Sequence, residues 1–172
     1  HGYPMTFQEI QYPIDLVNYG PPRTPGLHLS NILRAMAIHT KVFKDTDDLD
    51  ILIPNIDPLA VGKSGPLMRC IMGFAWENWM AANVLKQARF HPGEFFLDGI
   101  IGTPDCLEED EKWLTLHEIK WTFKSSSPPF SHHLMWLYQG ACYMKMVSHA
   151  YRTPISECRL IYHPCYVKGN YR

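Results

Sequence analysis

The stretch GTPDCLEEDEKWLTLHEIKWTF, residues 102–123, carries ionisable residues where an apolar strand would carry none. Its second half is rich in the aliphatic and aromatic residues of a strand, and the acidic run EEDEK is typical of a turn. Alternate residues of a strand share a face, so Leu114, Leu116, Glu118 and Lys120 point one way. The other face would carry Thr115, His117, Ile119 and Trp121. A face that begins apolar and ends ionic predicts a cleft at the far end of this strand.

Asp105 lies upstream of the turn, directly after Pro104. A tight acidic turn would make the segments on its two sides antiparallel neighbours, which lets Asp105 approach Glu118. Two close carboxylates repel each other and raise a pKa unless a cation neutralises them. Lys120 supplies one positive charge, and a divalent ion that prefers oxygen ligands, Mg²⁺ or Mn²⁺, completes the neutralisation. The residues themselves therefore predict a metal centre.

The composition indicates one globular domain, residues 1–172, with 46% hydrophobic and 19% charged residues. A net charge of −1 gives no overall basic character, so any contact with nucleic acid must use a local patch. The five cysteines include no CxxC pair, which argues against a disulfide framework and a zinc ribbon, and no iron–sulfur cluster is expected. No long apolar run or signal segment is seen, so we expect a cytoplasmic protein that is neither exported nor bound to a membrane.

The hydrophobic pattern predicts an α/β fold with a central sheet flanked by helices. Prolines and glycines over residues 1–27 predict an extended N-terminal arm, and Ser30 is the expected N-cap of the first helix. Helices are predicted over residues 28–43, 66–88 and 133–151, and strands over 94–107, 112–123 and 157–167.

The pair Pro104-Asp105, followed thirteen residues later by Glu118-Ile119-Lys120, resembles the PD-(D/E)XK motif of a large nuclease superfamily. Two further elements resemble the RecB-like and phage lambda-exonuclease-like branch of that superfamily. GFAWE matches its helical glycine-x-x-x-glutamate element, at Gly73 and Glu77, and QGACY matches its Gln-x-x-x-Tyr element, at Gln139 and Tyr143. The elements occur in the order of the family over residues 73–143.

This resemblance implies a restriction-endonuclease-like core with a central mixed β-sheet, and hydrolysis of phosphodiester bonds in DNA. One or two Mg²⁺ or Mn²⁺ ions would be held by Glu77, Asp105, Glu118 and the backbone carbonyl of Ile119. Lys120 would hold or activate the attacking water and offset charge, and Gln139 and Tyr143 would support the site from a helix. An exonuclease acting on DNA ends or single strands in recombination, repair or phage DNA processing is expected, in a bacterial or phage-infected cell. Such a protein could be a homo-oligomer or bind a recombination partner protein.

Residues that could contact the DNA backbone follow the E-x-K strand. Lysine and hydroxyl groups commonly contact phosphates, which makes Lys124, Ser125 and Ser126 candidates, and His132 opens the next predicted helix, whose N-terminal amides also favour phosphate.

Several alternatives remain at the level of sequence. Asp98 is a second acidic residue that could replace Asp105 as a ligand, and Glu77 could lie on a solvated helix face. Gln139 and Tyr143 could simply belong to a buried helix. The whole chain could be a nuclease-fold protein that binds DNA or a partner without cutting, or a restriction-type endonuclease.

Overall fold

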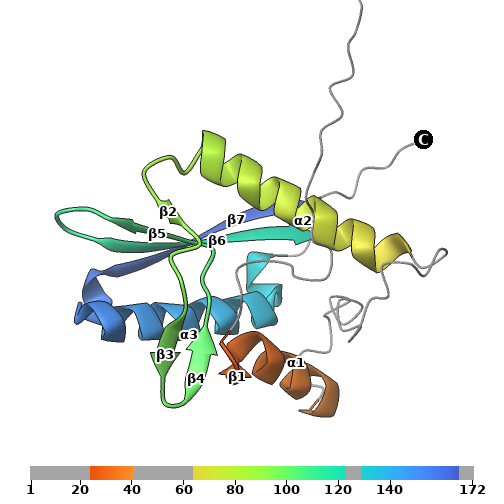
Figure 1. Ribbon diagram of the computed structural model, residues 1–172, viewed down its shortest axis with the longest axis horizontal. Helices are drawn as coiled ribbons and strands as arrows, with labels where there is room; N and C mark the ends of the chain where they lie inside the picture. The colour runs from red at the N-terminus through yellow and green to blue at the C-terminus, as the bar shows by residue number, and fades with distance from the viewer. Residues whose placement is uncertain (1–23, 41–63, 123–128, 167–172) are drawn as a thin grey trace, which may run out of the picture.

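The fold is described by a computed structural model over residues 24–40, 64–122 and 129–166 (Figure 1). Its centre is a four-stranded mixed sheet with the strand order β2-β5-β6-β7. Strand β5 is antiparallel to both β2 and β6, whereas β6 and β7 are parallel. The strands are β2 (Arg89–Phe90), β5 (Cys106–Glu109), β6 (Leu114–Thr122) and β7 (Cys158–Tyr166). The predicted α/β class and the antiparallel hairpin across the acidic turn are confirmed.

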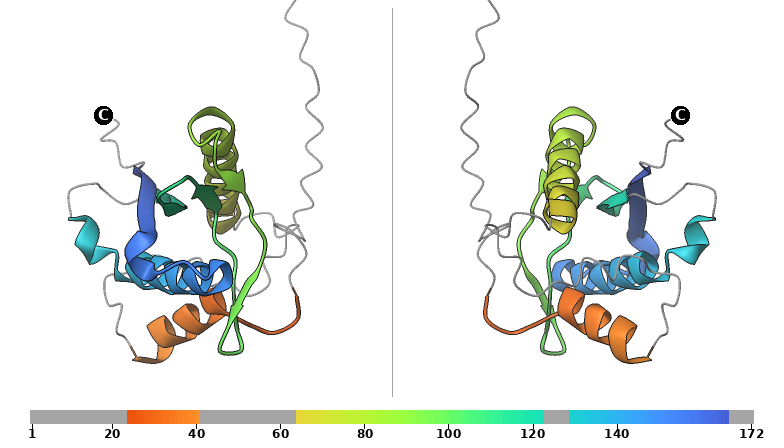
Figure 2. Two further views of the ribbon diagram at one scale, coloured as in Figure 1. Left: turned by 90° about the vertical axis from the view of Figure 1, so that its left-hand side faces the viewer. Right: turned by 90° about the vertical axis from the view of Figure 1, so that its right-hand side faces the viewer.

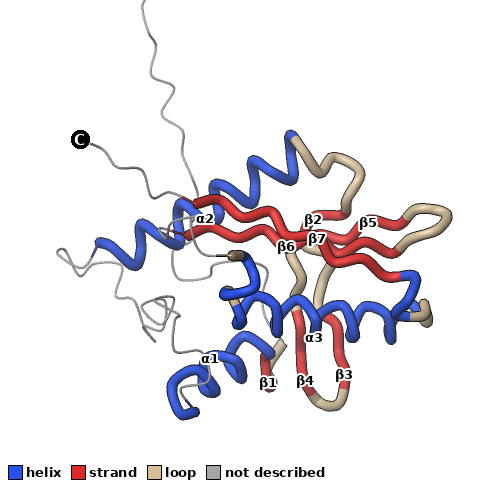
Figure 3. The backbone as a smooth tube through the Cα atoms, turned by 180° about the vertical axis from the view of Figure 1, so that it is seen from behind, coloured by secondary structure: helices blue, strands red, loops and turns tan. Residues whose placement is uncertain are grey.

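Two long helices cover the two faces of this sheet, α2 (Ser64–Asn83) on one and α3 (Leu134–Tyr151) on the other (Figures 1 and 3). Beneath α2, a small apolar cluster joins Met80 and Leu85 to Cys106 and Ile119 of the sheet. Because both faces of the sheet are covered, β6 is buried over most of its length. Each side chain of β6 therefore lies under α2 or under α3, according to the face to which it points.

The larger core lies on the α3 side of the sheet. It contains Leu114 and Leu116 of β6, and Tyr143, Met146 and Val147 of α3. Ile119 instead packs with the cluster under α2, so the predicted alternation of side chains along the strand is confirmed. Glu118 and Lys120 consequently lie on the face of the two buried leucines.

A second, smaller sheet, with the order β1-β4-β3, lies beside α3 (Figures 1 and 2). It consists of β1 (Leu27–His28), β3 (Phe95–Leu97) and β4 (Ile100–Gly102), and helix α1 (Leu29–Thr40) follows β1 directly. Short 3₁₀ helices, η2 (Phe130–His132) and η3 (Ile155–Glu157), flank α3.

The prediction of one strand over residues 94–107 is wrong, because the segment forms β3, β4 and the start of β5. Asp98 and Gly99 have φ values of 52° and 77°, the left-handed conformations of a tight two-residue hairpin turn. Aspartate followed by glycine is a frequent sequence at such turns, since glycine adopts positive φ without strain. Asp105 therefore precedes a strand rather than ending one.

The boundaries of the first two predicted helices also change. Helix α1 begins at Leu29, so Ser30 lies within its first turn and is not the N-cap. Helix α2 spans Ser64–Asn83 instead of 66–88, and the chain then turns through hydrogen bonds from the amides of Val84 and Leu85 to the carbonyl of Met80. The predicted N-terminal arm is described only from residue 24 onward, and residues 41–43 of the first predicted helix lie outside the described ranges.

Within the described ranges, the helices lack the combination of length and apolar character that crossing a membrane requires.

Gly140 provides a test of how closely α3 packs on the sheet. A Cβ atom added there would overlap the Tyr162 hydroxyl and lie 2.9 Å from Leu160 Cδ2. Alanine normally stabilises a helix relative to glycine, yet here the clash is with the underlying strand. We predict that Gly140→Ala lowers the free energy of unfolding by about 2 kcal/mol, measured by urea denaturation.

Gly73 of α2 is the matched control for that substitution. A Cβ atom added there would make only an ordinary contact, 3.9 Å from Trp121 Cβ. Gly73→Ala should therefore be neutral or stabilise the protein by up to about 1 kcal/mol. Equal effects of the two substitutions would contradict the packing described.

Candidate active site

The hairpin formed by β5 and β6 brings Asp105 and Glu118 together as predicted. Cys106 pairs with His117, and continuing this antiparallel register by one residue places Asp105 opposite Glu118. The Asp105 carboxylate accepts a hydrogen bond of 2.7 Å from the backbone N–H of Ile119. That bond holds Asp105 against β6 although Asp105 itself lies outside the strand.

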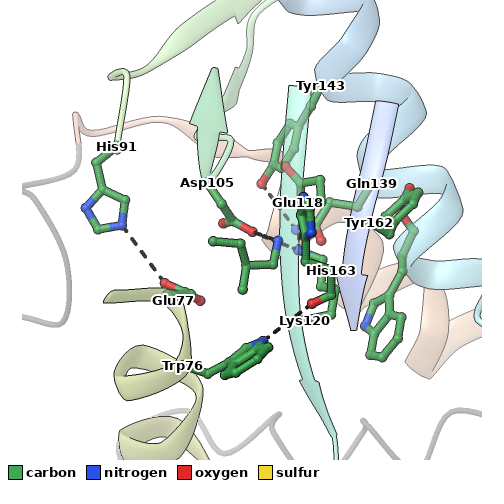
Figure 4. Close-up of polar contacts among 12 residues, drawn as sticks. Trp76, Glu77, His91, Asp105, Glu118, Lys120, Gln139, Tyr143, Tyr162 and His163 are labelled. Carbon is green, nitrogen blue, oxygen red and sulfur yellow. Dashed lines mark hydrogen bonds and ion pairs between the residues drawn. The ribbon is translucent and has the colours of Figure 1, made fainter. Parts of the chain in front are cut away.

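Lys120 connects the two carboxylates (Figure 4). Its Nζ donates to Glu118 Oε2 at 2.6 Å and to Asp105 Oδ2 at 3.3 Å. The side chains are 12%, 0% and 18% exposed for Lys120, Glu118 and Asp105 respectively. Three charged groups are thus held together in a largely dry position at the end of the β6 face that begins with two leucines.

Glu118 is the most buried residue of the cluster. Its Oε1 atom is buried and has no hydrogen-bond partner among the described residues. Burial, reinforced by the negative charge of Asp105, raises the pKa of Glu118 to about 8, while Lys120 acts in the opposite direction. A buried carboxylate oxygen without a partner is costly, so a positive ion beside Oε1 would relieve both the desolvation and the repulsion.

For Lys120, the nearby charges have a larger effect on the pKa than burial does. Burial alone would lower the pKa of its ammonium group, but the charges of Asp105 and Glu118 outweigh that effect and raise the pKa. The lysine therefore stays positively charged in this arrangement. One lysine thus faces two carboxyl groups, and burial together with the charge of Asp105 holds the pKa of Glu118 above its usual range.

Gln139 and Tyr143 lie on α3, the helix that covers the Glu118 face of the sheet (Figure 4). Gln139 Nε2 donates to the Tyr143 hydroxyl at 3.2 Å, and the aromatic ring of Tyr143 is part of the larger core. Burial, together with the charge of Glu118, raises the pKa of Tyr143. The two residues form one hydrogen-bonded pair, and Tyr143 packs in the larger core while its hydroxyl bonds to Gln139.

Glu77 approaches the cluster from α2. Its side chain is 21% exposed, which is half-buried rather than solvated, and Oε2 lies 4.0 Å from His91 Nε2. Burial raises the pKa of Glu77, an effect that the contact with His91 partly offsets, and the charges of Asp105 and Lys120 also act on it. Glu77 is therefore a neighbour of the Asp105–Lys120–Glu118 cluster, although it contacts His91 instead of joining the cluster directly.

Among the remaining candidates, the structure describes the side chain of Asp98 alone. Asp98 is exposed at the tip of the β3–β4 hairpin, so it is not the ligand that replaces Asp105. Lys124, Ser125 and Ser126 lie outside the described residues. His132 ends η2, and the structure describes its backbone but not its side chain.

Sequence reasoning missed two neighbours of the site, Tyr162 and His91. Tyr162 of β7 pairs with Glu118, and its hydroxyl donates to the Trp136 carbonyl at 2.7 Å. His91 follows β2, a two-residue strand that carries no periodic signal. The parallel pairing of β7 with β6 could have suggested Tyr162, whereas nothing in the local sequence indicates the contact between His91 and Glu77.

A further hydrogen-bonded chain braces the opposite face of β6. His117 contacts Glu108 through Nε2 at 3.1 Å and His163 through Nδ1 at 3.0 Å. These contacts connect β5, β6 and β7 one residue away from Glu118. They fix the lateral position of the strand that carries the candidate site.

Two hard oxygen donors, the carboxylates of Asp105 and Glu118, meet at this site, and Glu118 Oε1 is open to a further partner. This donor set suits Mg²⁺ or Mn²⁺. Over the described ranges, groups of three or more histidine, cysteine, aspartate or glutamate side chains arranged to hold a metal ion are not found. Any third or fourth ligand would have to come from a shift of Glu77, from a backbone carbonyl or from water.

No family model and no curated protein matches the chain. Among solved structures, one described as "Crystal structure of SSO0001" is similar over 84% of this chain, at 17% sequence identity and a TM-score of 0.40. This chain spans 65% of that chain's length. A similarity at this level assigns neither fold nor function, so the site must be interpreted from its own geometry.

The buried ion cluster leads to a prediction about stability. Lys120→Met removes the cation from two buried carboxylates, and breaking a buried ion pair on one side is strongly destabilising. We expect the free energy of unfolding to fall by about 3 kcal/mol in urea denaturation without added metal. Adding Glu118→Gln to that variant should recover part of the loss, because the buried negative charge is then gone.

The exposed Lys86 supplies the control for the lysine substitution. Lys86→Met should change stability by less than about 0.5 kcal/mol. If Lys120→Met were as mild as the control, the cluster would not be a strongly coupled buried group.

Proposed function

We propose that this chain is a metal-dependent nuclease that hydrolyses phosphodiester bonds in DNA. The observation that carries the proposal is the buried cluster of Asp105, Lys120 and Glu118, with Glu118 Oε1 left without a partner among the described residues. These are the motif residues whose resemblance to PD-(D/E)XK nucleases is seen in the sequence. A buried ion cluster is seldom more stable than well-packed apolar residues of the same volume, which favours a role in chemistry.

The proposal includes the fold. Helix α2, the β3–β4 and β5–β6 hairpins, helix α3 and strand β7 follow one another along the chain around a mixed sheet. This is the order that a restriction-endonuclease-like core requires of the four motif elements. Glu77 lies on α2, Glu118 and Lys120 lie on β6, Gln139 and Tyr143 lie on α3, and Asp105 immediately precedes β5.

Asp105 and Glu118 would hold one or two Mg²⁺ or Mn²⁺ ions, helped by Glu77 and by the backbone carbonyl of Ile119. When bound, such an ion polarises the phosphoryl oxygen and lowers the pKa of a water molecule. Glu118 fits this role because its Oε1 is buried and without a partner in the described part of the chain. Asp105 fits because the N–H of Ile119 fixes its carboxylate beside β6.

Lys120 would supply the fixed positive charge that phosphoryl transfer needs. Its ammonium is held by Asp105 and Glu118, and fixed charges near a developing negative charge lower the barrier without reorganisation. Three N–H donors let it also hold a water molecule or a phosphate oxygen. Gln139 and Tyr143 would support this group from α3, where their hydrogen bond orients the Tyr143 hydroxyl.

We further propose that the substrate is a DNA end or a single strand, as in recombination, repair or phage DNA processing. Lys124, Ser125, Ser126 and His132 would contact the phosphate backbone, since they flank the strand that carries Glu118 and Lys120. Assembly as a homo-oligomer or with a recombination partner belongs to the same proposal.

Cleavage of end-labelled DNA tests the function. Single- and double-stranded substrates are incubated with the chain in Mn²⁺, Mg²⁺ or excess EDTA, and the products are resolved on a denaturing gel. We predict cleavage with either ion and none in EDTA, with Asp105→Asn and Glu118→Gln each slower by at least about 100-fold because each removes a charged ligand. Asp98→Asn, on the exposed hairpin, is the control and should cut at the wild-type rate.

Each opposite result has a distinct meaning. Cleavage that persists in EDTA would refute a metal-dependent mechanism. Cutting of covalently closed circles at the same rate as linear DNA would replace the end-dependent enzyme with a restriction-type endonuclease. DNA binding without cleavage in either ion would indicate a nuclease-fold protein that binds DNA but does not cut it.

A further inference from the structure

His91 lies outside the strands, yet its backbone and its ring each have a specific contact. Its backbone φ is +47°, a left-handed conformation that is uncommon for residues other than glycine. The imidazole ring stacks on the ring of Phe90, with the two centroids 3.8 Å apart. The backbone N–H of His91 donates to the backbone carbonyl of Asp105 at 2.9 Å. A strained backbone held in this way is often found where a side chain has a task.

The position of His91 follows from the sheet. Phe90 pairs with Cys106, so the next residue, His91, stands opposite Asp105, just as Asp105 stands opposite Glu118. A residue in extended conformation would share the face of its cross-strand neighbour. The left-handed backbone departs from that alternation, and the ring instead reaches Glu77 on helix α2.

His91 is thus a direct link between two acidic groups that belong to different elements (Figure 4). Its backbone is bonded to the Asp105 segment, and its Nε2 lies 4.0 Å from Glu77 Oε2. Phe90, the ring on which it stacks, packs against the cluster of Met80, Cys106 and Ile119 beneath α2. The imidazole is therefore held against the sheet, with the Glu77 carboxylate within ion-pair distance of it.

We propose that His91 is a positioning residue of the candidate metal site, which holds the Glu77 carboxylate toward Asp105 so that both can bind the same ion centre. This inference rests on the proposed function. It explains why the Glu77 side chain is half-buried and contacts His91. Residues that orient metal ligands typically contribute 10- to 100-fold to metal affinity.

Mn²⁺ binding by the full chain, measured by isothermal titration calorimetry in the absence of DNA, tests the inference without relying on cleavage. His91→Gly removes the imidazole, keeps the N–H to Asp105 and relieves the left-handed backbone. We expect the dissociation constant for Mn²⁺ to rise by about 10-fold or more. Asp98→Gly is the matched control, since Asp98 has φ +52° at the exposed hairpin tip, and it should bind Mn²⁺ within about twofold of wild type.

A double substitution separates positioning from an independent contribution. Glu77→Gln should weaken Mn²⁺ binding by itself. If His91 acts through Glu77, adding His91→Gly to Glu77→Gln should cause no further loss, because the carboxylate to be positioned is already gone. A residue that merely supported the fold would weaken binding in both backgrounds alike.

Thermal melting of every variant checks folding, and His91→Asn, which also tolerates left-handed φ, replaces His91→Gly if the latter melts below the assay temperature.

Wild-type affinity in the His91 variant, or losses that simply add in the double variant, would overturn the inference and leave the proposed nuclease intact. Absence of Mn²⁺ binding by the wild-type chain would overturn the proposed metal centre and the inference with it.

Discussion

The contact between the Lys120 ammonium and the carboxylates of Asp105 and Glu118 is the interaction on which the candidate site depends. Both acids are largely withdrawn from water, and a single lysine cannot neutralise them fully. The rest of the structure makes this arrangement possible. Helices on both sides exclude water from β6, and the antiparallel register with β5 sets the two acids opposite each other.

The site is a row across the sheet rather than a cluster on one loop. Glu118 of β6 pairs with Tyr162 of β7. The antiparallel registers, each continued by one residue beyond β2 and β5, place Asp105 opposite Glu118 and His91 opposite Asp105. Backbone pairing therefore determines the spacing of the groups, and side-chain packing only refines it. This is an economical way to hold charged groups at fixed distances, because sliding one strand would break the whole ladder.

The central part of this arrangement could be predicted from the sequence, because alternation along a strand and an acidic turn are local signals. They were enough to place Glu118 and Lys120 on one face and Asp105 beside them. The β3–β4 hairpin could not be predicted as readily, although Asp98-Gly99 is a turn signal, because the apolar residues on both sides of the turn also fit one continuous strand. The contact of His91 with Glu77 could not be predicted, since it depends on an unusual φ and on the packing of α2 over the sheet.

Whether the Asp105–Lys120–Glu118 cluster is a metal centre can be seen by anomalous diffraction from crystals of the chain soaked in Mn²⁺. We predict an anomalous peak bonded to Glu118 Oε1 and to the Asp105 carboxylate, with Lys120 retained beside them. A map without a peak at these oxygens, at Mn²⁺ concentrations that support cleavage, would contradict it.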